Sequence, residues 1–109
     1  MVTVVIKKNE NGSYSGFTCS GHADFDEAGF DIVCSAISIL VLNTINSIAT
    51  LTYNDMECDS DEVTGDIICE FPDGLDDKGT ILIDSMIYGL KSVEGKYGSE
   101  YVKIIGNDK

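Results

Sequence analysis

The sequence contains no arginine and no tryptophan, and only one proline and one histidine. Its seven basic side chains are all lysines and stand against nineteen acidic ones, so the formal net charge is -12. This acidity argues against nucleic-acid phosphates and anionic lipid headgroups as general partners. We therefore expect no direct nucleic acid partner and no membrane partner, whereas a cationic protein or peptide fits the charge. A solvated acidic surface without a steering role explains the charge equally well.

Targeting and membrane-spanning signals are also lacking. Lys7 and Lys8 follow a short apolar run at the N-terminus, which is the reverse of a secretory signal. The longest strongly apolar stretch, residues 32–42, is well short of the roughly 20 residues that cross a bilayer. We therefore expect a cytoplasmic protein. A chain of 109 residues that is 43% hydrophobic can bury a modest core, which favours a single domain over 1–109.

The four cysteines, at positions 19, 34, 58 and 69, contain no CxxC pair. Their wide spacing, and the lack of an export signal, argue against a disulfide framework and predict free thiols. Zinc would need His22 and Cys34 plus two further ligands, but the other cysteines fall on separate predicted strands. The acidic residues 24–27 lack the spaced oxygens and closing glutamate of a calcium loop. We expect no metal and no cofactor.

The sequence does contain regular strand and helix patterns. Apolar residues alternate at both ends of the chain and in the middle, whereas residues 20–29 show neither a period of 2 nor one of 3.6 and indicate a loop. Asp31 is a plausible N-cap for the first helix, and Gly98 a plausible C-cap for the second. The predicted order is two strands (2–7 and 14–19), a helix (31–51), two strands (52–58 and 63–71), a helix (81–97) and a strand (101–105).

This order, ββαββαβ, indicates an α+β fold: a two-layer sandwich with a mixed or antiparallel sheet and two helices. In the second hairpin, Val63 is expected on the same buried face as Ile67, Cys69 and Phe71. The first helix is apolar nearly all round in its first half and polar on one stripe in its second half. One sheet covers one side of such a helix only. We therefore predict a homodimer in which a second copy covers another side.

Cys34 and His22 are the residues with the clearest chemical potential. A cysteine in the first turn of a helix lies where unpaired amides and the helix dipole favour thiolate over thiol. His22, in the preceding loop, can hold the proton that the thiol releases. Amides of Cys34 and its neighbours would point toward a developing oxyanion. The pair is a candidate Cys-His dyad for acyl chemistry.

Each of these residues also has an ordinary explanation. A helical cysteine usually fills the core, and a lone loop histidine is usually a polar surface residue. Asp31 either caps the helix or orients His22. Ser38, one turn after Cys34, either lines the same pocket or bonds back to a backbone carbonyl.

The segment Gly21-His22-Ala23, followed by Asp31-Ile32-Val33-Cys34-Ser35-Ala36-Ile37-Ser38, resembles the ribosomal-processing cysteine protease family Prp. The resemblance extends to the length, the element order and the closing strand. It implies a His22-Cys34 dyad supported by Gly21, Asp31 and Ser38, and a homodimer. It also implies a substrate, the precursor of the large-subunit ribosomal protein numbered twenty-seven, from which the family removes a short N-terminal extension. Ser35 departs from the alanine that is usual in the motif.

Two other functions remain open at this point. One is a non-catalytic, acidic, ribosome-associated binding module in which the cysteine is structural. The other is a different cysteine acyl-transfer enzyme, such as a thioesterase or an amidase. The basic ribosomal protein precursor suits the acidic surface, because a negative enzyme attracts a positive substrate.

Overall fold

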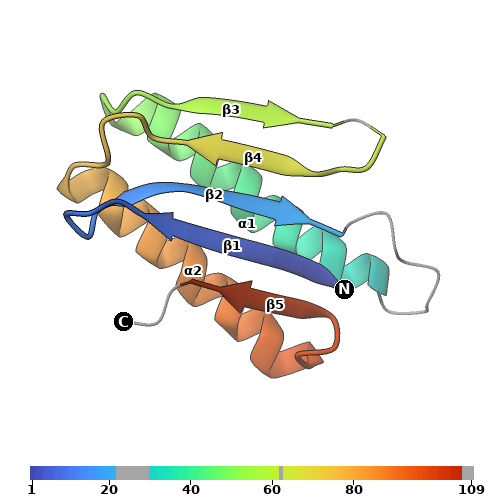
Figure 1. Ribbon diagram of the computed structural model, residues 1–109. Helices are drawn as coiled ribbons and strands as arrows, with labels where there is room; N and C mark the ends of the chain where they lie inside the picture. Colours follow the sequence, from blue (N-terminus) through green and yellow to red (C-terminus); the bar gives the residue numbers. More distant parts are fainter. Residues whose placement is uncertain (22–29, 62, 107–109) are drawn as a thin grey trace.

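The computed structural model describes residues 1–21, 30–61 and 63–106 (Figure 1). Its elements, in chain order, are β1 (Val2–Lys8), β2 (Tyr14–Ser20), α1 (Phe30–Leu51), β3 (Glu57–Ser60), β4 (Ile67–Glu70), α2 (Asp77–Tyr97) and β5 (Val102–Ile105). The predicted order ββαββαβ and the α+β class are confirmed.

The five strands form one sheet in the order β3-β4-β2-β1-β5. β1 and β5 run parallel, and the other neighbours run antiparallel, so the sheet is mixed. Both helices cover the same face of the sheet, which leaves the other face open (Figure 1). The architecture is therefore the predicted two-layer sandwich.

The core lies between this covered sheet face and the two helices. Val2, Val4 and Ile6 of β1 are buried, whereas the residues between them are more accessible, as strand alternation requires. Ile37 of α1 is fully buried in the same cluster, and so is Leu90 of α2. Burying a large aliphatic side chain stabilises the fold by about 1.5–3 kcal/mol, so these positions fix α1 against the sheet.

The helix boundaries correct two predictions and confirm a third. α2 begins at Asp77, earlier than predicted, because the Asp76 carboxylate caps it by accepting a hydrogen bond from the Gly79 amide at 2.9 Å. α2 ends where predicted, at Gly98, whose φ of 110° few other residues adopt and whose amide donates to the Glu94 carbonyl at 2.8 Å. α1 begins at Phe30, so Asp31 lies inside its first turn and is not the N-cap.

The second hairpin is shorter than predicted. Ile67, Cys69 and Phe71 are buried as expected, but Val63 is 90% exposed in the turn between β3 and β4. The prediction for Val63 is wrong because Asp61 begins a tight turn, its side chain accepting hydrogen bonds from the Val63 and Thr64 amides.

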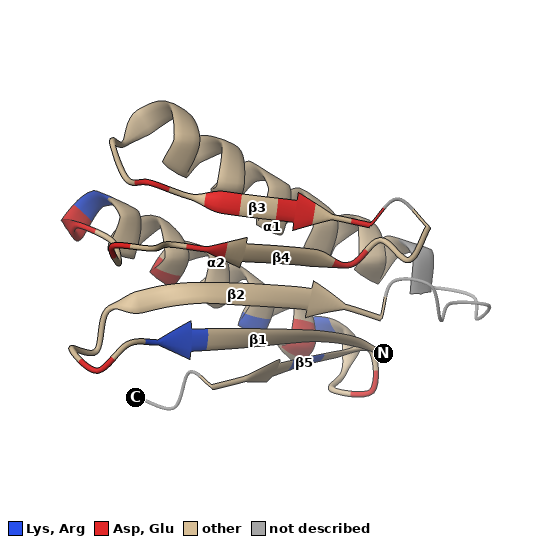
Figure 2. Ribbon diagram, turned by 45° about the horizontal axis from the view of Figure 1, so that its top comes forward, with Lys and Arg blue, Asp and Glu red and all other residues tan. Residues whose placement is uncertain are grey.

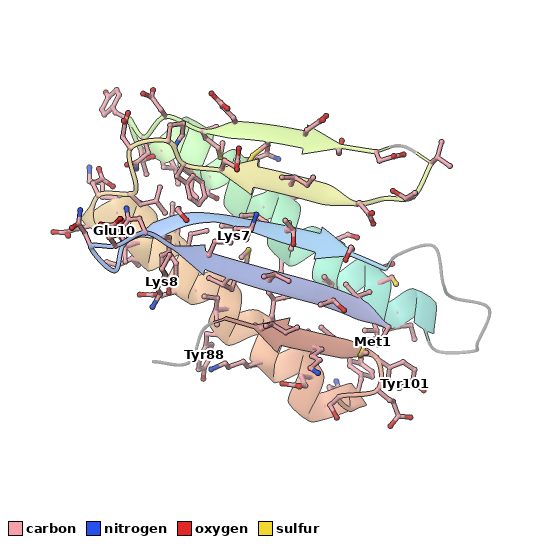
Figure 3. All side chains as sticks on the ribbon, in the orientation of Figure 1. Met1, Lys7, Lys8, Glu10, Tyr88 and Tyr101 are labelled. Carbon is pink, nitrogen blue, oxygen red and sulfur yellow. A yellow bond between two sulfur atoms is a disulfide. The ribbon has the colours of Figure 1, made fainter. Side chains whose placement is uncertain are left out.

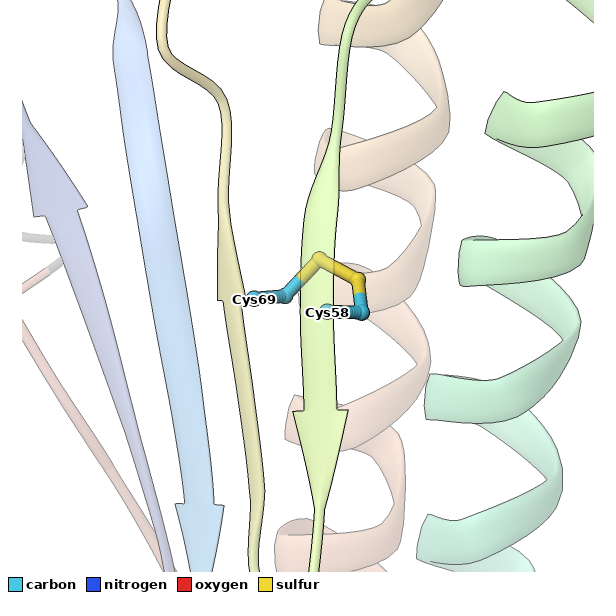
Figure 4. Close-up of a disulfide and its surroundings, with 2 residues drawn as sticks. All are labelled: Cys58 and Cys69. Atoms are coloured by element: carbon cyan, nitrogen blue, oxygen red, sulfur yellow. A yellow bond between two sulfur atoms is a disulfide. The ribbon is translucent and has the colours of Figure 1, made fainter.

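Cys58 and Cys69 are joined by a disulfide between β3 and β4 (Figure 4). They are register partners in the antiparallel pair, with Cα atoms 4.2 Å apart. The prediction that all four cysteines are free thiols is therefore wrong for these two, because strand pairing brings together residues eleven positions apart in the sequence. Cys19 and Cys34 take no part in a disulfide, as predicted.

The helix α1 is longer and more apolar than the run 32–42 suggested. Its segment Ile32–Leu51 has a mean hydropathy of 1.9 and would cross a membrane by length and composition. Counting only the strongly apolar run missed this, since the later polar residues interrupt the run without ending the helix. Val33, Ile37 and Ile48 are fully buried in the core cluster, which is the position of a core helix in an α+β domain.

Candidate active site

The predicted motif begins at the end of β2 with Gly21, which only a glycine can occupy. Its φ is +98°, a conformation that side chains disfavour. A Cβ atom built on Gly21 would lie 2.1 Å from the backbone carbonyl oxygen of Met1, and backbone cannot yield as a flexible side chain does. Gly21 therefore packs directly against the start of β1. His22, the next residue, lies outside the described residues.

The start of β1 is itself held in place. The Val2 amide donates a hydrogen bond of 2.9 Å to the Tyr101 carbonyl, just before β5. Met1 and Tyr101 lie at the same end of the sheet (Figure 3). The end of β2 and the beginning of α1 are at this end too (Figure 1). The fold thus brings Gly21 and the start of α1 to one end of the molecule.

Cys34 is the fifth residue of α1 and is 6% exposed. Cys34 was predicted in the first turn of the helix. It lies just beyond that turn, because the helix begins at Phe30. A helix that begins there commits the Cys34 amide to an intrahelical hydrogen bond, so this amide is not a free donor for an oxyanion. The helix dipole acts most strongly within the first turn, and Cys34 lies just beyond it.

Cys19, on β2, is the other cysteine outside the disulfide and is fully buried. Burial raises its pKa to about 12, and electrostatic interactions with Asp66 and Cys34 add to the rise. Cys19 therefore stays a neutral thiol near pH 7 and is a poor nucleophile. The same interactions show that Cys19, Cys34 and Asp66 share one electrostatic environment at this end of the sheet.

The two remaining predicted residues lie on α1. Ser38 is half-buried, four residues after Cys34, and so follows it on the same side of the helix. Asp31 is in the first turn, and its side chain lies outside the described residues. Their supporting roles stay predictions.

Comparison with known proteins decides the family. The family described as cysteine protease Prp matches residues 1–103. The chain belongs to the Prp family. It is 31% identical to the ribosomal processing cysteine protease Prp of Bacillus subtilis over 101 residues, which is 89% of this chain and 90% of that protein.

Two solved structures of Prp from S. aureus share the fold of this chain. The complex with a substrate peptide superimposes with a TM-score of 0.88 at 28% identity, covering 95% of this chain and 97% of that one. The complex with a covalently linked product peptide gives a TM-score of 0.84 at 28% identity, covering 96% and 98%. The protein is thus a cysteine protease of the ribosomal-processing Prp family. Membership of this family argues against a non-catalytic binding module.

A recess at the other end of the Prp fold contains none of the predicted site residues. It measures about 550 Å³ and lies between the β1–β2 turn and α2, beside Lys8, Tyr14 and Asp84. The Tyr14 hydroxyl donates a hydrogen bond to the Asp84 carboxylate. Burial, with this bond and the nearby charge, raises the pKa of Tyr14 to about 12. Lys8 and Glu10 mark this end (Figure 3), which is opposite to the end where α1 begins (Figure 1).

Sequence reasoning missed Asp66, which lies beside the motif in the Prp fold. It precedes β4, and its carboxylate accepts a hydrogen bond from the Gly21 amide at 3.4 Å. Only the hairpin register could have indicated it, because Ile67 pairs with Cys19 and so places Asp66 beside the end of β2. That register depends on the length of the β3–β4 turn, which is longer than the predicted strand bounds implied.

Proposed function

We propose that this protease removes the short N-terminal extension of the large-subunit ribosomal protein numbered twenty-seven, using Cys34 as nucleophile and His22 as general base. The observation that carries the proposal is that β2 ends and α1 begins at the same end of the fold (Figure 1). Gly21 leads directly into His22 at the end of β2, and α1 carries Cys34 from the same end.

The chemistry is that of a cysteine acyl transfer. His22 accepts the proton of the Cys34 thiol, and the thiolate attacks the carbonyl carbon of the scissile peptide bond. The C–N bond breaks as His22 returns the proton to the leaving amine, which leaves a thioester on Cys34. Water then hydrolyses the thioester, releasing the extension and restoring the thiol. The covalently linked product peptide of the S. aureus relative is compatible with such a mechanism.

A cleavage assay tests the assignment of the dyad. Incubation with the extended ribosomal protein, followed by mass analysis, is expected to show loss of the extension with the wild-type chain. Cys34→Ala is expected to abolish cleavage and to leave the fold nearly intact, because one small side chain replaces another. His22→Ala is expected to remove most activity. Cys19→Ala is the matched control and should retain activity; a Cys34→Ala chain that still cleaves contradicts the proposal.

The acidic surface supports a basic substrate. Acidic residues are frequent on β3 and β4 (Figure 2), and Glu57 on β3 and Glu70 on β4 are both exposed. A basic protein should therefore associate faster at low salt. We expect kcat/KM to fall as salt rises, and the double variant Glu57→Gln/Glu70→Gln to weaken this dependence. A kcat/KM that is independent of salt would contradict the role of charge.

We further propose that the protease is a homodimer. Ile32 and Ile39, in the N-terminal half of α1, and Leu42, just past its middle, are exposed, with Ile39 68% exposed. Most exposed residues after Leu42 are polar (Asn43, Asn46 and Thr50). A second copy would bury the three apolar side chains. Light scattering should give the mass of two chains for the wild type and for Thr50→Asp, on the polar half, but of one chain for Ile39→Asp. A wild-type chain that is monomeric at all concentrations contradicts the proposal.

We place the protein in the cytoplasm, where its ribosomal substrate is made. Cellular thiols keep cytosolic cysteines mostly reduced, so we expect Cys58 and Cys69 to be thiols in growing cells and a disulfide after isolation in air. Trapping thiols in intact cells before lysis measures this directly. A fusion to a reporter that is active only after export tests the location itself.

A further inference from the structure

The contact between Asp66 and Gly21 joins two parts of the chain that are 45 positions apart. Oδ1 of Asp66 lies 3.4 Å from the Gly21 nitrogen and accepts its hydrogen bond. Gly21 is the last described residue before His22. Whatever holds its backbone therefore also fixes the point from which the His22 segment departs.

Asp66 is well placed to act as an anchor because its own backbone is fixed. Its carbonyl accepts a hydrogen bond from the Asp61 amide at 2.9 Å, and its amide donates to the Thr64 hydroxyl at 3.2 Å. The turn is closed by a further bond of 2.7 Å from the Gly65 amide to the Asp61 carbonyl. The next residue, Ile67, pairs with Cys19 in the sheet. The carboxylate is thus presented from a hydrogen-bonded corner at the start of β4.

Gly21 needs such an anchor. Glycine has the widest range of backbone conformations. Without restraint at Gly21, the segment that carries His22 could therefore leave the sheet in many directions. On one side, close packing against the Met1 carbonyl limits Gly21. The Asp66 carboxylate holds its amide by a hydrogen bond. Together the two contacts fix both the position and the orientation of this peptide unit.

We propose that Asp66 is a positioning residue of the protease, which anchors the Gly21 peptide and so sets the start of the segment that carries His22. The inference rests on the proposed role of His22 as the general base. Displacing a catalytic group by about 1 Å can reduce a rate by roughly 100-fold, so a lost anchor should lower kcat. Binding of substrate, which Asp66 would not perform, should be little changed.

Three variants separate an anchor from a substrate-binding charge. Asp66→Ala removes the acceptor, whereas Asp66→Asn removes the charge and keeps an amide oxygen that can accept from Gly21. Asp59→Ala is the matched control, because Asp59 lines the same acidic recess of about 500 Å³ as Asp66 and carries the same charge. We expect kcat to fall at least roughly tenfold in Asp66→Ala with KM unchanged, and to stay within about threefold of wild type in the other two.

Two kinetic results would overturn the proposal. If Asp66→Ala and Asp66→Asn both raise KM and leave kcat unchanged, Asp66 binds a cationic group of the substrate instead. If Asp66→Ala cleaves like the wild type, Asp66 has no part in positioning.

Amide hydrogen exchange at Gly21 supplies a readout that needs no activity. Exchange should be at least roughly tenfold faster in Asp66→Ala than in the wild type and in Asp59→Ala, because the acceptor is lost. Unchanged exchange would show that no anchor exists, whatever the kinetics. Faster exchange with unchanged kcat would show an anchor that does not position the base. A wild-type chain that cleaves nothing would instead refute the proposed function, and the exchange result would still decide the anchor.

Discussion

Alkylation by iodoacetamide should be much faster at Cys34 than at Cys19, because thiolate is the reactive form. Burial and neighbouring charge raise the pKa of Cys19 to about 12, so about 10⁻⁵ of its molecules are thiolate at pH 7. A thiol with an ordinary pKa of about 8.5 is about 3% thiolate at the same pH. If His22 activates Cys34 at least to the level of such an ordinary thiol, Cys34 should react at least about 10³ times faster than Cys19.

The assay is intact-mass analysis after a timed reaction at pH 7 without reductant. We expect one added group, located on Cys34 by peptide mapping, because Cys58 and Cys69 are joined. The variant Cys34→Ser is the control and should show no fast addition. Prior reduction should make two further groups appear, on Cys58 and Cys69.

Two outcomes would refute the reasoning. Labelling of Cys19 as fast as that of Cys34 would show that its burial and raised pKa do not protect it. Slow labelling of Cys34, at the rate of an ordinary buried thiol, would show that no base activates it and would sink the proposed mechanism. His22→Ala distinguishes activation by the histidine from activation by the helix, because only the former is lost with the imidazole.

Three further predictions concern stability, measured by urea unfolding. Gly21→Ala should destabilise the fold by more than about 1 kcal/mol, because its φ is positive and its new Cβ meets backbone, whereas Gly95→Ala, a helical site with open space around it, should be neutral or stabilising. Ile37→Ala should cost about 2–5 kcal/mol and Val63→Ala less than about 0.5 kcal/mol, since the first is fully buried and the second is exposed. Hydrogen bonds from an asparagine side chain and a helix amide lower the pKa of Asp76 below 3.8, so its contribution is present above pH 3.8 and is lost as the pH falls through the lower folded value. Asp76→Asn should reduce the loss of unfolding free energy below pH 3.8. A loss equal to that of the wild type would contradict the assignment.

Local pattern predicted most of the fold. Alternation along β1, the apolar periodicity of α2 and the cap at Gly98 are set by neighbours a few residues apart, so they can be read without tertiary information. The Gly21-His22 and Cys34 motif was also found from the sequence, because the residue types and their order carry it. The N-terminal ends of the helices were predicted less accurately than their existence. The first helix begins at Phe30, before the predicted cap Asp31, because helix propensity does not decide which of several neighbouring residues starts a helix.

The amino-acid sequence by itself thus determined the element order and the candidate dyad. Only the tertiary structure decided which distant residues meet. Pairing of β3 with β4 sets Cys58 opposite Cys69, and pairing of β4 with β2 sets Asp66 beside Gly21. Strand register depends on turn length and on packing across the whole sheet, and a shift of one residue would turn each of these side chains to the other face. For that reason no local pattern could have revealed either contact.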